Sequence, residues 1–87
     1  MPEISRFYGI VLTMYADDHN PPHIHARYAE YKCKVNINTG EVIAGKFPGK
    51  QLKLVQAWLI IHHKELINNW EERNKDKPNF FKIDPLT

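Results

Sequence analysis

The chain has 87 residues, of which 43% are hydrophobic and 25% are charged, and its formal net charge is +2. These are ordinary values for a globular domain. The net charge is too small to indicate, by itself, a nucleic-acid-binding protein. A chain of this length can bury one modest core, so we expect a single domain over residues 1–87.

The cellular compartment is predicted from the membrane-spanning and signal-peptide patterns that the sequence lacks. No apolar run approaches the roughly 20 residues that span a bilayer, and the first residues do not follow the pattern of a signal peptide. The single cysteine, Cys33, cannot form an internal disulfide and is expected to be a small core residue. We therefore expect a cytoplasmic protein with no membrane partner.

The first predicted element is a strand over residues 7–15, because this segment is rich in β-branched and aromatic residues and shows no helical spacing. A stiff loop follows, since two prolines restrict their own backbone and that of the residues before them. The residues expected to support this loop are Asp18, His19, Asn20, Pro21 and Pro22.

A hairpin is predicted next. If Ala29-Glu30 is a two-residue loop, the register follows by counting outwards, so that Tyr28 faces Tyr31. The polar face of the hairpin then carries imidazoles and cations without an acidic residue. Those residues are His23, His25, Arg27, Lys32 and Lys34. Two interpretations stay open: the face binds an anion, or the long side chains are solvated and splay apart.

The remaining elements complete an α+β fold. A turn at residues 38–40 leads into a fourth strand over residues 41–44, and glycines and a proline at 45–49 are expected to end the sheet. From residue 50 to about residue 70, apolar residues recur with a period of 3.6. We therefore predict a four-stranded antiparallel meander with one long C-terminal helix packed on one face.

Apolar residues outside the main stripe of this helix predict association. Leu54, Ile60, Ile61 and Ile67 lie on its flanks, and the tail around residues 80–83 can shield only one of them. We expect a homodimer, or a heterodimer with a small partner protein, joined through the outer helix face or an edge strand. The alternative is a monomer with scattered surface isoleucines.

Two chemistries fit the histidine-rich stretch. His19, His23 and His25 offer three nitrogens to a metal, with Asp17 and Asp18 nearby, but the second ligand cluster typical of structural zinc is missing unless His62 or His63 supplies it. We expect no physiological metal and no cofactor, only opportunistic uptake of nickel or zinc. The other chemistry is proton transfer, because imidazole changes its protonation state near neutral pH.

In that second interpretation the histidines act as the catalytic acid and base of a metal-independent ribonuclease, while cations hold the phosphodiester. The catalytic pair is His23 and His25. The residues expected to bind phosphate are Arg6, Arg27, Lys32 and Lys34.

Residues 2–10, 18–28, 38–42 and 58–70 resemble the small bacterial family called domain of unknown function 4160, whose hallmark Asn20-Pro21-Pro22-His23-Ile24-His25 is present in full. Such families are often encoded beside a partner of the family called domain of unknown function 2442, which resembles a toxin-antitoxin or regulatory pair. The resemblance implies a toxin-like, nucleic-acid-directed, RNA-binding component, with a non-enzymatic module that contacts a partner protein or DNA as the alternative.

Overall fold

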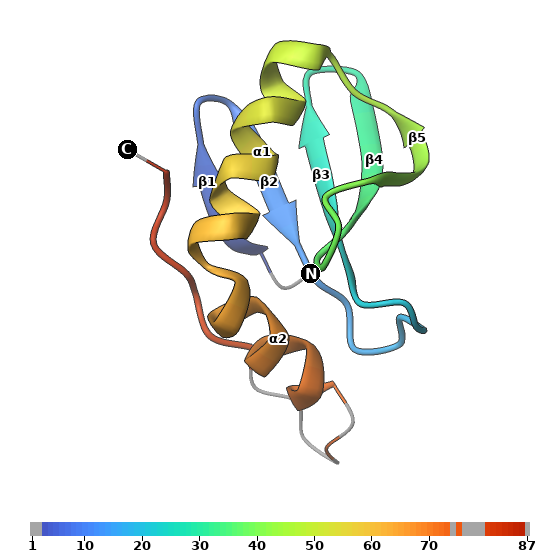
Figure 1. Ribbon diagram of the computed structural model, residues 1–87, viewed down its shortest axis with the longest axis vertical. Helices are drawn as coiled ribbons and strands as arrows, with labels where there is room; N and C mark the ends of the chain where they lie inside the picture. Colours follow the sequence, from blue (N-terminus) through green and yellow to red (C-terminus); the bar gives the residue numbers. More distant parts are fainter. Residues whose placement is uncertain (1–2, 74, 76–79, 87) are drawn as a thin grey trace.

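The computed structural model describes residues 3–73, 75 and 80–86, and it shows an α+β architecture in which the helices lie across one face of an antiparallel sheet (Figure 1). Each strand of the sheet pairs with its neighbours in sequence, so the topology is a meander, as predicted. The elements are β1 Glu3–Phe7, β2 Ile10–Thr13, β3 His23–Tyr28, β4 Tyr31–Asn36, β5 Val42–Lys46, α1 Gly49–Ile61 and α2 His63–Glu72. In the described part of the chain, no helix has the length and apolarity needed to cross a membrane.

The sheet has five strands where four were predicted, because the chain reverses direction inside the expected first strand. The reversal occurs at Tyr8 and Gly9, whose φ angles are 49° and 78°. Two successive residues with positive φ are typical of the type I′ hairpin turn, which matches the twist of the strands it joins. Residues 3–7 therefore form β1 and pair with β2, although no strand was predicted before residue 7.

The predicted register of the β3–β4 hairpin is confirmed at every pair, from Tyr28 opposite Tyr31 to His23 opposite Asn36. By contrast, β5 does not end where glycine was expected to stop it. It runs on through Gly45, whose φ of 86° and missing side chain let it pass close to the carbonyl of Lys32. The sheet therefore extends two residues beyond the predicted fourth strand, to Lys46.

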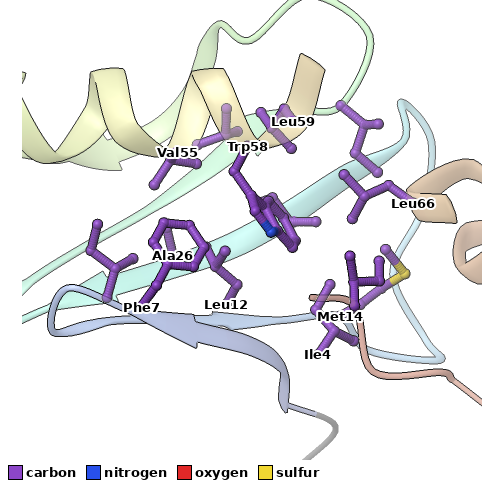
Figure 2. Packing of buried hydrophobic residues seen from close by; sticks show 14 of the residues in the cluster. Ile4, Phe7, Leu12, Met14, Ala26, Val55, Trp58, Leu59 and Leu66 are labelled. Atoms are coloured by element: carbon purple, nitrogen blue, oxygen red, sulfur yellow. The ribbon is translucent and has the colours of Figure 1, made fainter. Parts of the chain in front are cut away.

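The core lies between the inner face of the sheet and the helices, with Trp58 of α1 at its centre (Figure 2). Trp58 is completely buried, its ring centroid lies 5.7 Å from that of Phe7, and its Nε1 donates a hydrogen bond of 2.8 Å to the carbonyl of Asp84. The strands contribute alternate residues to this layer, among them Leu12, Ala26 and Val35. The opposite face of β2, β3 and β4 is left uncovered by α1.

The single long helix was a wrong prediction, because α1 ends at Ile61 and α2 begins at His63. The intervening His62 has φ −110° and ψ 23°, outside the helical region. Its Nδ1 lies 2.7 Å from Oε1 of Glu65 and its ring 5.7 Å from that of Trp58, which fits a histidine at the boundary of the core. The break lets α2 continue past the end of the sheet (Figure 1), where Trp70 packs against the ring of His23.

Residues 80–86 form a tail that runs back along β1. The amide of Ile83 donates to the carbonyl of Ile4 over 2.8 Å, and the side chain of Asn69 bonds both backbone groups of Phe81. Of the flanking apolar residues, Leu54 and Ile67 pack partly against the core, whereas Ile60 and Ile61 are 79% and 63% exposed. The expected association stays a prediction.

Cys33 is expected to be unreactive in the folded protein. It is 4% exposed, and burial raises the pKa of its thiol to about 11. Above about pH 9 the thiol of the unfolded chain ionises while that of the folded chain stays protonated. The free energy of unfolding should therefore fall between about pH 9 and pH 11, and fall less steeply in Cys33→Ala.

Two measurements check this expectation: urea unfolding against pH for both chains, and labelling by a disulfide reagent at pH 8. Native labelling should be many times slower than labelling in denaturant. Labelling at the same rate in both conditions would contradict it.

Candidate functional site

The outer face of the sheet, opposite α1, gathers cationic side chains across several strands. Directly paired residues point to the same side of a sheet, so the register aligns Arg6 and Val11 with Arg27, Lys32 and Lys46 in one row. The neighbouring row aligns Thr13, His25, Lys34 and Ala44. On β3 and β4, both rows therefore contain residues that strand alternation had predicted for this face.

A hollow of about 530 Å³ lies over these rows, and we call it the cationic hollow. Its polar wall is made by Arg27, Lys32, Lys34, His25 and Tyr15, and no Asp or Glu is among the described residues that line it. Backbone of β5 at Ala44 and Gly45 closes one side. The hollow therefore offers positive charge to a ligand from two neighbouring strands.

Arg6 does not join the other three predicted phosphate-binding residues. Its Nη2 donates a hydrogen bond of 2.7 Å to Oε1 of Glu3 at the protein surface, and this bond lowers the pKa of Glu3 below its usual value. Arg6 does not line the cationic hollow. An acidic residue thus reaches the outer face from β1, a strand that sequence reasoning had not found.

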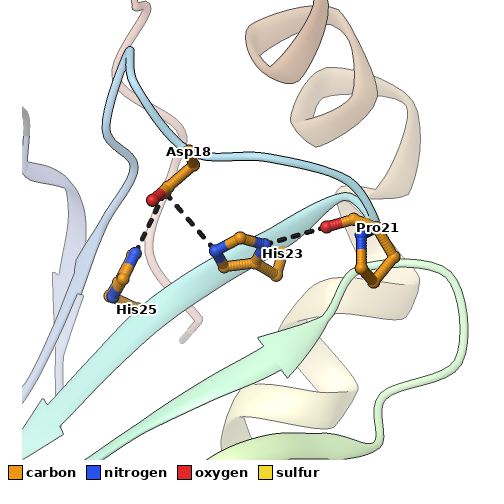
Figure 3. Close-up of polar contacts among 4 residues, drawn as sticks. All are labelled: Asp18, Pro21, His23 and His25. Carbon is orange, nitrogen blue, oxygen red and sulfur yellow. Dashed lines mark hydrogen bonds and ion pairs between the residues drawn. The ribbon is translucent and has the colours of Figure 1, made fainter.

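Three side chains converge at the end of β3 where the β2–β3 loop closes over the sheet (Figure 3). We call Asp18, His23 and His25 the His–Asp cluster. The amide of Asp18 bonds the carbonyl of Tyr15 over 3.3 Å, which turns the loop back. Oδ2 of Asp18 then lies 3.0 Å from Nε2 of His25 and 3.5 Å from Nε2 of His23.

The ring of His23 is held on three sides. Its Nδ1 lies 2.8 Å from the carbonyl oxygen of Pro21, and a carbonyl can only accept, so Nδ1 carries the proton. The ring centroids of His25 and Trp70 each lie 5.3 Å away. Only 6% of His23 is exposed. Its Nε2 therefore faces Asp18 in a fixed direction.

The predicted loop-support residues divide into two groups. Asp18 is part of the site itself, and the carbonyl of Pro21, which follows a cis Asn20–Pro21 peptide bond, orients His23. His19 and Asn20 are exposed, and His19 does not belong to the cluster, although it had been considered as a metal ligand. The sequence signal for Asp18 was only its closeness to the histidines.

The two predicted catalytic histidines are neighbours, but they do not both line the cationic hollow. Both Nε2 atoms are directed at one oxygen of Asp18, and His23 is buried behind it. His25 is half-buried, lines the cationic hollow, and is contacted edge to face by Tyr15 at 4.6 Å between ring centroids. Of the two imidazoles, that of His25 lines the cationic hollow and that of His23 does not.

Comparison with known proteins gives one result. A family model described as domain of unknown function (DUF4160) matches residues 9–71, and this range contains both the His–Asp cluster and the cationic hollow but not Arg6. No curated protein and no solved structure matches the chain.

Proposed function

Because the chain belongs to the family of domain of unknown function DUF4160, whose description assigns no activity, we propose a function from the site itself. The protein is a toxin-like, nucleic-acid-directed component of a toxin-antitoxin type of pair, and it binds single-stranded RNA along its outer face. The observation that carries the proposal is the cationic hollow, where Arg27, Lys32 and Lys34 surround one concave surface.

Charge supports an anionic ligand at this place. Arg27 and Lys32 are directly opposite each other on neighbouring strands, and like charges so placed destabilise a sheet by about 0.2–1 kcal/mol. A phosphate between them turns that repulsion into two attractions. Tyr15 adds an aromatic ring on which a base can stack, the usual partner of positive charge in proteins that bind single strands.

Cleavage of the bound RNA would be the work of His25. In a metal-free cluster the Nε2–H of His25 donates to Asp18, which leaves Nδ1 as the nitrogen able to accept a proton. Nδ1 takes the proton of a ribose 2′-hydroxyl, the 2′-oxygen bonds to the adjacent phosphorus, and the bond from phosphorus to the 5′-oxygen breaks. The expelled 5′-oxygen takes a proton from water, and the hydroxide left behind takes back the proton held by His25. Lys34, opposite His25, and Arg27 would stabilise the charge on the phosphate.

A second function, a non-enzymatic binding or regulatory module, is favoured by one specific observation. His23 is buried behind Asp18, so the pair of imidazoles expected to flank a phosphate is reduced to one at the hollow. Cleavage of a phosphodiester is most effective with two proton carriers, one for the attacking and one for the leaving oxygen. Binding without cleavage is what such a module would show.

The binding proposal predicts that removal of cationic side chains from the cationic hollow lowers the affinity for RNA. It also predicts that the affinity then depends less steeply on salt concentration. For Lys32→Ala with Lys34→Ala, we expect at least a tenfold weaker affinity for a single-stranded RNA, and a slope of log K against log salt reduced by about 1.4, or about 0.7 for each lost phosphate contact. Fluorescence anisotropy over a salt series measures both quantities.

The matched control is Lys53→Ala with Lys64→Ala, which removes the same charge from exposed positions on α1 and α2. It should leave the affinity within about twofold. If both double variants lost the same RNA affinity, RNA would be attracted only by the net charge of the protein. The cationic hollow would then not be the binding site.

Cleavage is tested separately, with EDTA present so that no metal occupies the cluster. His25→Ala should abolish cleavage while RNA still binds. The control is His63→Ala, which removes an imidazole from an exposed position on α2 and should cleave RNA as the unmodified chain does. Intact RNA after incubation with a protein that binds it would select the non-enzymatic module.

A further inference from the structure

We propose that the His–Asp cluster is a binding site for one divalent transition-metal ion, held by two imidazole nitrogens and one carboxylate oxygen. The ligands are Nε2 of His23, Nε2 of His25 and Oδ2 of Asp18. This inference departs from the expectation that the physiological protein holds no metal. It does not depend on RNA binding, because metal binding can be measured without RNA.

The distances among the three atoms suit an ion between them. Zinc binds nitrogen and oxygen at about 2.0–2.1 Å, so two ligands of a tetrahedral site lie about 3.3–3.4 Å apart. The Nε2 atoms of His25 and His23 lie 3.0 Å and 3.5 Å from Oδ2 of Asp18, and the three ligand atoms, one from each residue, all lie within 4.8 Å of one another. Side-chain movements of a few tenths of an ångström would bring each nitrogen to ligand spacing from the Asp18 oxygen, and the two imidazoles would turn towards each other around the ion.

His23 supplies an independent observation. Its Nε2 is buried, is directed at the carboxylate of Asp18, and has no hydrogen-bond partner among the described residues. Because Nδ1 donates to the carbonyl of Pro21, Nε2 of the neutral ring presents a lone pair towards a carboxylate oxygen. Two lone pairs facing each other in a buried place are unfavourable, and a cation between them removes the conflict.

The hydrogen bond to Pro21 also has the form found behind metal-binding histidines. Such a histidine usually donates its other ring N–H to a backbone carbonyl or carboxylate, which fixes the tautomer and the ring direction. Contacts with Trp70 and His25 restrict the ring further. His23 is therefore prepared to bind through Nε2, in contrast with a flexible surface histidine that binds metal by chance.

The donor set indicates the class of ion. Imidazole nitrogen suits zinc, copper, iron and nickel, and two histidines with one carboxylate leave at least one coordination position open. No other described His, Cys, Asp or Glu joins the three ligands. His25 belongs to both the cluster and the cationic hollow, so an open position at this ion would lie beside the hollow.

The test is titration of the untagged full chain with zinc chloride by calorimetry, after removal of bound metal with EDTA and dialysis. We expect one zinc ion per chain with a dissociation constant in the micromolar range or below. Asp18→Asn keeps the size of the side chain but removes its negative charge and replaces one acceptor oxygen with an NH2 donor, and it should weaken binding at least 100-fold, as should His23→Gln. Zinc should raise the Tm of the unmodified chain and leave that of Asp18→Asn unchanged.

His19→Ala is the matched control, since it removes an exposed imidazole from the same loop. It should bind zinc as the unmodified chain does. A similar loss in His19→Ala and His23→Gln would show adventitious binding to a histidine-rich segment and overturn the proposal, as would binding that survives Asp18→Asn. Circular dichroism of each metal-free variant confirms that loss of binding is not loss of folding.

Discussion

Trp58→Ala is expected to lower the free energy of unfolding by about 3–5 kcal/mol, the usual cost of removing a large buried aromatic side chain. Trp58 is completely buried, packs against Phe7, and donates a hydrogen bond to the carbonyl of Asp84, which the substitution leaves without its donor. A domain of this length has a total stability of about 4–13 kcal/mol, so a large part of it would be lost. Urea unfolding followed by far-ultraviolet circular dichroism measures the change.

Two variants on α1 separate burial from other effects. Trp58→Phe keeps an aromatic ring but loses the donor to Asp84, so its cost should fall below that of Trp58→Ala. Ile60→Ala lies on the same helix at 79% exposure, and it should change the stability by no more than about 0.5 kcal/mol. Equal effects of Trp58→Ala and Ile60→Ala would refute the assignment of Trp58 to the centre of the core.

Gly45→Ala should destabilise the protein by about 3 kcal/mol, because backbone strain and a steric clash act together. A Cβ at this position would lie 2.3 Å from the carbonyl oxygen of Lys32 and 2.9 Å from Cα of Cys33, and the residue has a φ of 86°. Both neighbours are backbone atoms of β4, so β5 must move away from β4. The same urea titration reports the loss of stability.

The effect of Gly45→Ala should extend to the cationic hollow, since Gly45 lines it and Lys32 stands opposite the next residue of β5. RNA affinity should fall under conditions where the variant is still folded. Gly49→Ala is the matched control: its added Cβ meets no atom within 4 Å, and it begins α1. It should leave stability unchanged or raise it by up to about 1 kcal/mol. A Gly45→Ala protein as stable as Gly49→Ala would contradict the close approach of the two strands.

The parts of the fold that sequence predicted are those governed by local rules. Alternation along β3 and β4, and a loop of two residues between Tyr28 and Tyr31, were sufficient to predict both the faces and the register. The turn at Tyr8 and Gly9 was missed because apolar residues continue on both sides of it. Its only signal was a glycine within a strand pattern.

The helix break could not be predicted from periodicity, because the apolar stripe passes through His62 without interruption. The two segments pack in different places: Trp58 covers the sheet, whereas Trp70 packs at the end of the sheet against His23, the first residue of β3. Such a change of direction depends on tertiary packing. The extension of β5 through Gly45 is similar, since it requires a conformation that the sequence permits but does not demand.

The candidate site was predicted in its composition and not in its arrangement. The strand pattern placed His23 and His25 together, but burial of His23 depends on Trp70, which lies 47 positions later in the chain. The way the loop closes decides which of its residues turns towards the histidines. Asp18 occupies the place in the cluster that had been considered for His19. Sequence spacing alone does not distinguish adjacent residues in an irregular loop.

The bond between Ile83 and Ile4 has a consequence for the order in which the protein is completed during its synthesis. The edge of β1 gains this partner only after residues 80–86 have left the ribosome. Ribosomes add about 5–20 residues per second, so the tail follows β1 by about 4–16 s. Once it has been made, Trp58 also lacks its acceptor until Asp84 follows. The nascent chain can form the β3–β4 hairpin early, whereas the core is secured only after residues 80–86 have been made.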